Sequence, residues 1–227
     1  SGNSNFNYGR NYFFTKISKR KYRRVKGKLE KSLEKIDCFI LAAGMSKRMG
    51  KDNKLLKKIN NNIIINQTLM NHIESKINNI YLILGHEKDL ILENIDYKEI
   101  FIVENNNYKS GMLSSILKID ENIDDKTSGI LISLADMPFV TSNDINNLIE
   151  IFNKNNQELI CIPKNRGKLG NPILLPKKIY KDLTKDLSKL SQDRGLKKLI
   201  LEKKYEFIEV NLSKGVTKDF DTIEDFN

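Results

Sequence analysis

Two glycines, two small alanines and several cations follow an apolar run near residue 40. The segment 41–50 reads LAAGMSKRMG, and Lys54 lies four residues beyond it. Glycines at a strand end let backbone amides turn toward a phosphate chain, and Arg48 and Lys54 could neutralise its charge. Gly44 and Gly50 enclose five residues and no Ser or Thr follows the next lysine, so the spacing is not that of a P-loop. The three-glycine dinucleotide pattern is also absent. The segment therefore predicts a phosphate-binding loop of another kind.

The elements that must position this loop follow from the hydrophobic pattern. From residue 37 onward, short β-branched runs alternate with helical patterns, which is typical of βαβ units and a mostly parallel sheet with helices on both faces. We expect one α/β domain of the Rossmann-like type. The runs that predict strands are 38–42, 80–84, 99–103, 129–134, 159–162, 173–175 and 207–210.

Two helices have clear sequence signatures. The clearer one spans 143–152, with apolar residues at positions i, i+3, i+4 and i+7 and with Thr141 or Ser142 as a possible N-cap. The other follows Gly111 and has Leu113, Ile116 and Leu117 on one face. Residues 28–36 also look helical and lead into the first strand.

The net charge of +10 is concentrated at the amino end. Residues 1–36 hold eleven Lys or Arg against two Glu, so residues 37–227 are nearly balanced. We interpret 1–36 as a basic arm or linker, or the remnant of an upstream domain, and 37–227 as the folded domain. The arm has aromatic residues beside its cations and could bind nucleic acid, but the balanced body offers no second basic face, so we regard such a partner as the weaker hypothesis.

We expect neither a membrane-spanning segment nor a secretory signal from this sequence. Its longest apolar stretch, 39–45, is far shorter than a transmembrane helix. Cys38 and Cys161 are too few and too far apart for a disulfide framework or a zinc site, so we expect buried strand thiols. We expect a cytoplasmic protein.

Several motifs together resemble one family. The segment 41–50 resembles the signature loop of the molybdenum cofactor cytidylyltransferases and guanylyltransferases, a nucleotidyltransferase family. Similar segments follow in the same order, namely 105–115 (NNNYKSGMLSS), 134–140 (LADMPFV), 167–172 (GKLGNP), 193–195 (DRG) and 219–225 (DFDTIED). The resemblance covers about residues 38–227. Ala135, Leu169, Gln192 and Ile223 depart from the usual pattern, three of them in acceptor-side or carboxy-terminal segments.

The resemblance implies a nucleotide site with CTP as the substrate. The nucleotide-binding residues it implies are Leu41, Ala42, Ala43, Gly44, Ser46, Arg48, Gly50, Lys54, Gly111, Ser114 and Ser115. Relatives that use guanine have a second glycine in place of Ala43, and a methyl group there narrows the room for a purine. CTP is therefore favoured over GTP. Ser114 and Ser115 are candidate hydroxyl partners of the nucleotide, with helix capping as the alternative.

In-line attack of a phosphate on a nucleoside triphosphate needs no general base, because the attacking phosphate is already ionised near neutral pH. Catalysis then depends on positioning and charge neutralisation, for which Arg48, Lys54 and Asp136 are the candidates. Mg²⁺, or alternatively Mn²⁺, requires one or two carboxylates together with substrate phosphates. We expect Asp136 and Asp221 as ligands, with Asp219 as an alternative to Asp221.

The acceptor implied by the resemblance is the phosphate of molybdopterin, which would receive CMP with release of pyrophosphate. Candidate acceptor-binding residues are Gly170, Asn171, Pro172 and Asp193. A molybdenum enzyme would receive the product. Two alternatives stay open: transfer to a sugar or polyol phosphate, and a nucleotide-binding maturation factor for a molybdenum enzyme. His72 and His86 have no ligand-type partners in the sequence, so we expect them to be structural or solvent-facing.

Overall fold

The computed structural model describes residues 35–45, 53–59, 61–95, 99–185 and 195–220. All of these residues belong to one compact unit, Lys35–Asn227. Its main sheet has eight strands in the order β10-β7-β9-β6-β1-β4-β5, with β8 paired to β7. The strands are β1 (Lys35–Ala42), β4 (Asn79–Leu84), β5 (Phe101–Glu104), β6 (Thr127–Leu134), β7 (Ile160–Asn165), β8 (Lys168–Leu169), β9 (Ile173–Pro176) and β10 (Phe207–Asn211). All seven predicted strands are present.

Parallel pairing dominates the sheet, as predicted. β1 lies between β4 and β6 and is parallel to both, β5 is parallel to β4, and β10 is parallel to β7. Two strands pair antiparallel: β9 with β6 and β7, and the two-residue β8 with β7. β1 is buried along almost its whole length, which explains its continuous apolar run. A separate two-stranded hairpin, β2 (Lys58–Ile59) with β3 (Asn62–Ile63), was not predicted.

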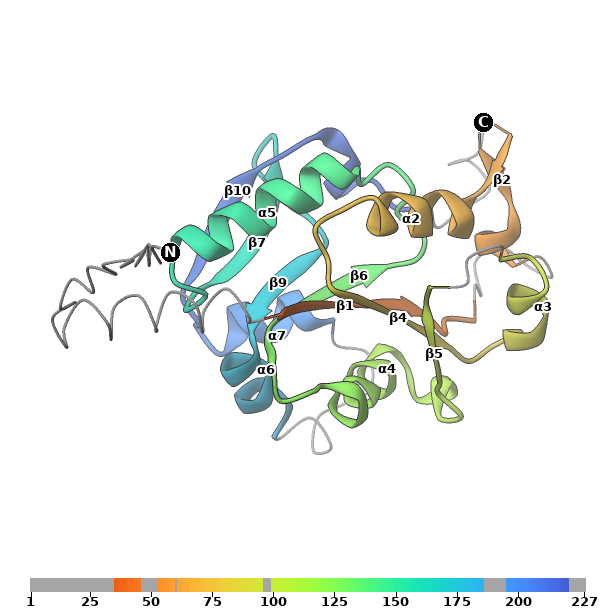
Figure 1. The fold of residues 1–227 in the computed structure, drawn as a ribbon, viewed down its shortest axis with the longest axis horizontal. Helices are drawn as coiled ribbons and strands as arrows, with labels where there is room; N and C mark the ends of the chain where they lie inside the picture. Colours follow the sequence, from red (N-terminus) through yellow and green to blue (C-terminus); the bar gives the residue numbers. More distant parts are fainter. Residues whose placement is uncertain (1–34, 46–52, 60, 96–98, 186–194, 221–227) are drawn as a thin grey trace, which may run out of the picture. The chain divides into compact units, whose positions relative to one another are not determined.

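Helices cover both faces of the sheet, as Figure 1 shows. On one face lie α2 (Ile64–Ile73) and α5 (Ser142–Lys154), and on the other α4 (Met112–Lys118), α6 (Lys177–Thr184) and α7 (Leu196–Glu202). A short α3 (Lys88–Leu92) follows β4. Two apolar clusters correspond to the two faces, one containing Cys38, Ile40 and Phe152 and the other Phe39, Ile116 and Tyr180. None of the helices in the described part of the chain is long and apolar enough to span a membrane.

Local details confirm some expectations and correct others. Thr141 caps α5 through a capping box with Asp144, as one of the two predicted alternatives. Cys38 and Cys161 are buried free thiols, and burial raises the pKa of Cys161 to about 12. Leu113, Ile116 and Leu117 lie in α4 as predicted, but only Leu113 and Ile116 are buried, whereas Leu117 is 37% exposed. Residues 35 and 36 lie in β1 and not in a helix, whereas 1–34 lie outside the described residues.

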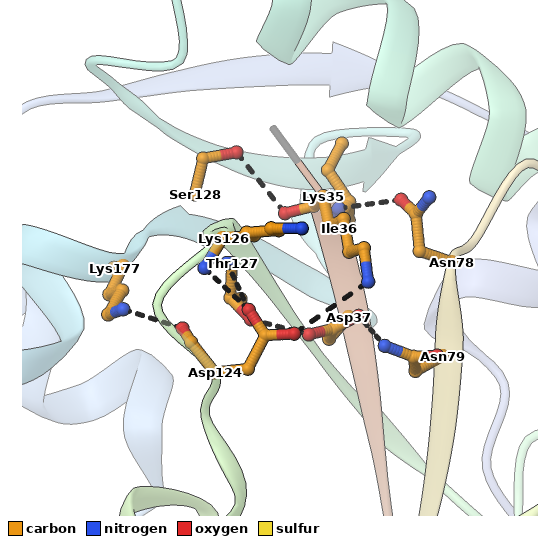
Figure 2. Close-up of polar contacts among 10 residues, drawn as sticks. All are labelled: Lys35, Ile36, Asp37, Asn78, Asn79, Asp124, Lys126, Thr127, Ser128 and Lys177. Carbon is orange, nitrogen blue, oxygen red and sulfur yellow. Dashed lines mark hydrogen bonds and ion pairs between the residues drawn. The ribbon is translucent and has the colours of Figure 1, made fainter. Parts of the chain in front are cut away.

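A polar cluster ties the first residues of β1 to neighbouring strands (Figure 2). Asp37 is fully buried, and its carboxylate accepts hydrogen bonds from Thr127 Oγ1 at 2.5 Å and Asn79 Nδ2 at 2.9 Å. Burial raises the pKa of Asp37 and outweighs these two hydrogen bonds; the nearby Asp124 also raises it, while Lys35 lowers it. The cluster lies at the amino end of β1, so it anchors the sheet at the end opposite to the loop that follows Ala42.

Replacing Asp37 with Asn should change how stability depends on pH. Because the folded-state pKa is raised, the contribution of Asp37 to stability is fully present below its unfolded pKa of about 4 and is lost as pH rises through the folded pKa. The amide introduced by the substitution would carry no charge at any pH. We therefore expect the difference in melting temperature, Asp37→Asn minus wild type, to become more positive between pH 4 and pH 7. A difference that stays constant over this range would contradict the expectation.

Candidate active site

A cavity of about 530 Å³ lies at the carboxyl ends of β1 and β6. In a parallel α/β sheet this edge is where ligands bind. Its lining contains eight of the predicted site residues, namely Leu41, Ala42, Ala43, Gly44, Lys54, Gly111, Ser115 and Asp136. Asp219, the alternative metal ligand, lines it as well. The cavity therefore brings together residues that are far apart in the sequence.

Lys54 and Asp136 form an ion pair inside this cavity. Lys54 Nζ lies 2.5 Å from Asp136 Oδ2, and the two side chains are only 15% and 14% exposed. Asp136 follows the end of β6, whereas Lys54 begins the 3₁₀ helix η2 (Lys54–Leu56). At this low exposure, the lysine can neutralise an incoming phosphate chain and the carboxylate can bind the metal ion that accompanies it.

Asn53 fixes the orientation of η2 and was not predicted from the sequence. Its Oδ1 accepts a hydrogen bond from the amide of Leu55, and its Nδ2 donates to Glu87 Oε2 at 2.9 Å. Asn53 is 8% exposed, so this cap is shielded from water. The contact joins η2 to the segment after β4, and only the fold could reveal it.

Glycines shape two parts of the cavity wall. A Cβ on Gly44 would meet nothing within 4 Å, so the Gly44 backbone faces open space. Gly111 has a φ of 86°, a left-handed conformation that favours glycine, and it joins η3 (Tyr108–Ser110) to α4. A Cβ on Gly85 would lie 2.6 Å from that of Tyr108 and 3.0 Å from that of Ala43. Gly85 therefore allows Tyr108, a lining residue without a predicted role, to pack beside the loop after β1.

The two predicted serines have different environments. Asn105 is fully buried, and its Nδ2 donates to Ser114 Oγ at 2.8 Å and to Ser115 Oγ at 3.0 Å. Ser114 donates back to the carbonyl of Gly111, so its hydroxyl is used within the helix start. Ser115 lines the cavity and Ser114 does not. Asn105 belongs to the 105–115 motif, but the sequence alone gave it no role.

Helix α2 holds the segment around Asp136 in place. Thr68 Oγ1 donates to the carbonyl of Ala135 at 3.0 Å, and Asn71 Nδ2 donates to the carbonyls of Pro138 and Val140 at 2.9 and 2.8 Å. These contacts bracket Asp136 on both sides.

His72 adds a third contact between α2 and the same segment. It is buried, its Nδ1 lies 2.7 Å from the carbonyl of Thr68, and its Nε2 lies 2.8 Å from Ser133 Oγ. Since a carbonyl only accepts, Nδ1 carries the proton and Nε2 accepts from Ser133. Burial lowers the pKa of His72 to about 4, so the ring is neutral at pH 7. His72 is thus structural.

Removing the hydroxyl of Thr68 should lower turnover through Asp136. In Thr68→Val the carbonyl of Ala135 loses its partner, and the resulting shift of Asp136 should reduce kcat by about tenfold. Thr68→Ser retains the hydroxyl and should recover most of the loss. Steady-state rates of pyrophosphate release measure both variants.

Thr184 offers the matched control, because it is also buried but donates to the carbonyl of Tyr180 within its own helix α6. Thr184→Val should lower the melting temperature and leave kcat unchanged. Equal kcat values for Thr68→Val and wild type would show that the Thr68 hydrogen bond does not position Asp136.

The remaining predicted residues fall into two groups. Gly170, Asn171 and Pro172 do not line the cavity. The amide of Asn171 donates to the carbonyl of Val216 in the 3₁₀ helix η6 (Lys214–Thr217) at 2.8 Å. A Cβ on Gly170 would lie 2.0 Å from that same carbonyl, so close packing requires glycine there. The second group lies outside the described residues: Ser46, Arg48, Gly50, Asp193 and Asp221.

Carboxylates are the metal-ligand type that this cavity offers. Asp136 and Asp219 line it, and the amide of Phe220 donates to the carbonyl of Asp136 at 3.1 Å, which fixes the two segments side by side. Within the described ranges, no group of three or more His, Cys, Asp or Glu residues could hold a metal ion. An oxygen-only pair suits Mg²⁺ or Mn²⁺, which take further ligands from water and phosphate.

The structure shows an α/β fold with a cavity at the carboxyl ends of its strands, and comparisons with known proteins identify the family. Residues 38–206 match the MobA-like NTP transferase domain. The chain therefore belongs to this family and is a nucleotidyltransferase. It is 29% identical over 147 residues to the molybdenum cofactor cytidylyltransferase of Escherichia coli, covering 63% of this chain and 70% of that protein.

Solved structures show the same fold. The Rv0371c protein of Mycobacterium tuberculosis superimposes with a TM-score of 0.72 at 20% identity, covering 85% of this chain and 95% of that one. A nucleotidyl transferase from Methanothermobacter superimposes with a TM-score of 0.71 at 17% identity, covering 85% and 94%. These similarities confirm the predicted fold class.

Proposed function

We propose that the protein transfers CMP from CTP to the phosphate of molybdopterin in a Mg²⁺-dependent reaction that releases pyrophosphate. The observation that carries the proposal is the Lys54–Asp136 pair within a cavity that the loop after β1 also lines. The 29% identity to a molybdenum cofactor cytidylyltransferase supports the acceptor and the nucleotide. The proposal places the enzyme in the cytoplasm, with a molybdenum enzyme receiving the product.

In this proposal a phosphate oxygen of the acceptor attacks the α-phosphorus of CTP. The new oxygen–phosphorus bond forms as the bond between the α-phosphorus and the bridging oxygen breaks, and the electron pair leaves with pyrophosphate. Lys54 neutralises charge on the phosphate chain, together with Arg48 from the loop. Gly44 lines the cavity and has open space around its Cα, so backbone amides of this loop would be the donors to phosphate oxygens.

Asp136, together with Asp219 or Asp221, would hold the metal ion. When bound, Mg²⁺ supplies charge neutralisation and orientation of the triphosphate oxygens. A manganese complex of the structurally similar Rv0371c protein, with 19% identity, makes Mn²⁺ the alternative to test. No residue need act as a general base, because the acceptor phosphate is ionised at neutral pH.

The base preference rests on Ala43. Ala43 is 4% exposed, and its methyl group packs against Gly85, where an added Cβ would lie only 3.0 Å away. The methyl group is therefore confined. A confined methyl next to the loop favours the smaller pyrimidine. Ser115 offers a hydroxyl to the nucleotide from α4, and Asn105 holds that hydroxyl in place.

The test is pyrophosphate release with molybdopterin and each of CTP, GTP, ATP and UTP, with Mg²⁺, with Mn²⁺ and with EDTA. We expect release with CTP that requires both the divalent ion and molybdopterin. Omission of molybdopterin controls for hydrolysis of the nucleotide. Release with GTP alone would overturn the base assignment, and release with a sugar or polyol phosphate in place of molybdopterin would overturn the acceptor.

A further inference from the structure

Lys197 carries a partly buried ammonium group. It lies in the first turn of α7, and its Nζ donates to the carbonyl of Leu169 at 3.0 Å. Among the residues that the structure describes, no carboxylate lies within 4.0 Å of this Nζ, whereas Lys164, Lys181 and Lys118 all pair with acidic side chains. Burial lowers the pKa of Lys197, as does the nearby Lys168, and Asp219 raises it.

The position of Lys197 relates it to the cavity. Asp219, whose charge acts on Lys197, is a lining residue. Gly195, two residues earlier, would place a Cβ 4.0 Å from Sδ of Met112, which also lines the cavity. The residue before α7 therefore lies next to Met112, although no residue of α7 itself lines the cavity. Met112 and Asp219 belong to segments other than the loop after β1 and η2, where the triphosphate is proposed to bind.

A half-buried ammonium that donates to one neutral carbonyl is poorly compensated. Desolvation disfavours its charged form, and one neutral acceptor recovers only part of the lost hydration. An anionic group of a ligand would compensate for the lost hydration of the ammonium group through a charge-assisted hydrogen bond. Lys168 adds a second positive charge nearby. The environment therefore suits a ligand with a negative charge, such as a phosphate monoester.

We propose that Lys197 binds the anionic phosphate of the acceptor, with Lys168 as a second cation, beside the edge of the cavity that Asp219 and Met112 line. This proposal rests on the proposed function, since it places the acceptor opposite the nucleotide. Lys197 is then a residue that determines affinity for the acceptor and not for CTP.

Kinetics of Lys197→Gln test this role. We expect the KM for molybdopterin to rise at least tenfold, while the KM for CTP stays within twofold of wild type. Lys198→Gln is the matched control, because Lys198 follows on the same helix and its side chain is 62% exposed. It should leave both KM values unchanged. An unchanged KM for molybdopterin in Lys197→Gln, or an equal rise in both KM values, would overturn the proposal.

A binding measurement separates this proposal from the proposed function. The ¹³Cε signal of Lys197, assigned by its loss in Lys197→Gln, is followed while methyl phosphate is added to the wild-type protein with CTP and Mg²⁺. We expect methyl phosphate to change the ¹³Cε chemical shift of Lys197 and to raise the pH midpoint of its titration. The chemical shift of Lys198 should not change. No shift would overturn the anion site even if molybdopterin is a substrate. If the Lys197 signal shifts with methyl phosphate but CTP and molybdopterin together give no pyrophosphate, the anion site is supported and molybdopterin is rejected as the acceptor.

Discussion

Replacing Asp136 with Asn should lower kcat for nucleotidyl transfer by about 10³-fold. The side chain would keep its size but lose the charge that lies 2.5 Å from Lys54 Nζ. It would also lose one of the carboxylates proposed to hold the divalent ion, and an amide oxygen is a weaker ligand for Mg²⁺. Rates of pyrophosphate release at saturating CTP and acceptor measure this loss.

Two controls make the Asp136→Asn result interpretable. The melting temperature without ligand should stay within a few degrees of wild type, because the backbone of this segment is held by Thr68, Asn71 and Phe220. Raising the Mg²⁺ concentration should recover part of the activity if metal affinity is the main loss. A loss of less than tenfold would show that Asp136 is not central to the reaction.

Replacing Lys54 with Met should have the second largest effect, with kcat reduced by about 10²-fold and the KM for CTP raised. Met fills much of the same volume but cannot neutralise a phosphate oxygen, and it leaves Asp136 without this ammonium partner. The matched control is Lys58→Met in β2, where the side chain is exposed. That variant should retain wild-type rates.

The double variant tests whether Lys54 and Asp136 act as a unit. The effects of residues in direct contact are not additive. We therefore expect the two single variants to raise the activation free energy by amounts whose sum is much larger than the increase measured for the double variant. Fully additive losses would mean that the two side chains act separately, in contradiction to the observed ion pair.

Much of the fold was predictable because buried strands have distinct apolar runs. The β1 and β6 runs were located to within three residues. The antiparallel direction of β9 could not be predicted, since a short buried run looks the same in either direction. The two-residue strands β2, β3 and β8 were too short to produce a hydrophobic period.

The candidate site was predictable where a residue belongs to a local motif. Gly44, Lys54 and Asp136 belong to such motifs, and the structure brings them into one cavity. Asn53 and Thr68 were missed because their roles depend on contacts with Glu87 and Ala135, which are 34 and 67 residues away in sequence. Such contacts between distant segments leave no pattern in a single sequence.

The central claim is that this cavity binds CTP with a divalent ion at Asp136. Thermal unfolding with CTP, GTP, ATP or UTP, with and without Mg²⁺, tests it most directly, with Asp136→Asn alongside. At a hundredfold excess over Kd, binding adds about 2.7 kcal/mol, or roughly 5–10 °C in Tm for a domain of this size. We predict a Mg²⁺-dependent rise of this size with CTP that Asp136→Asn loses. The absence of a shift with all four nucleotides would contradict the account.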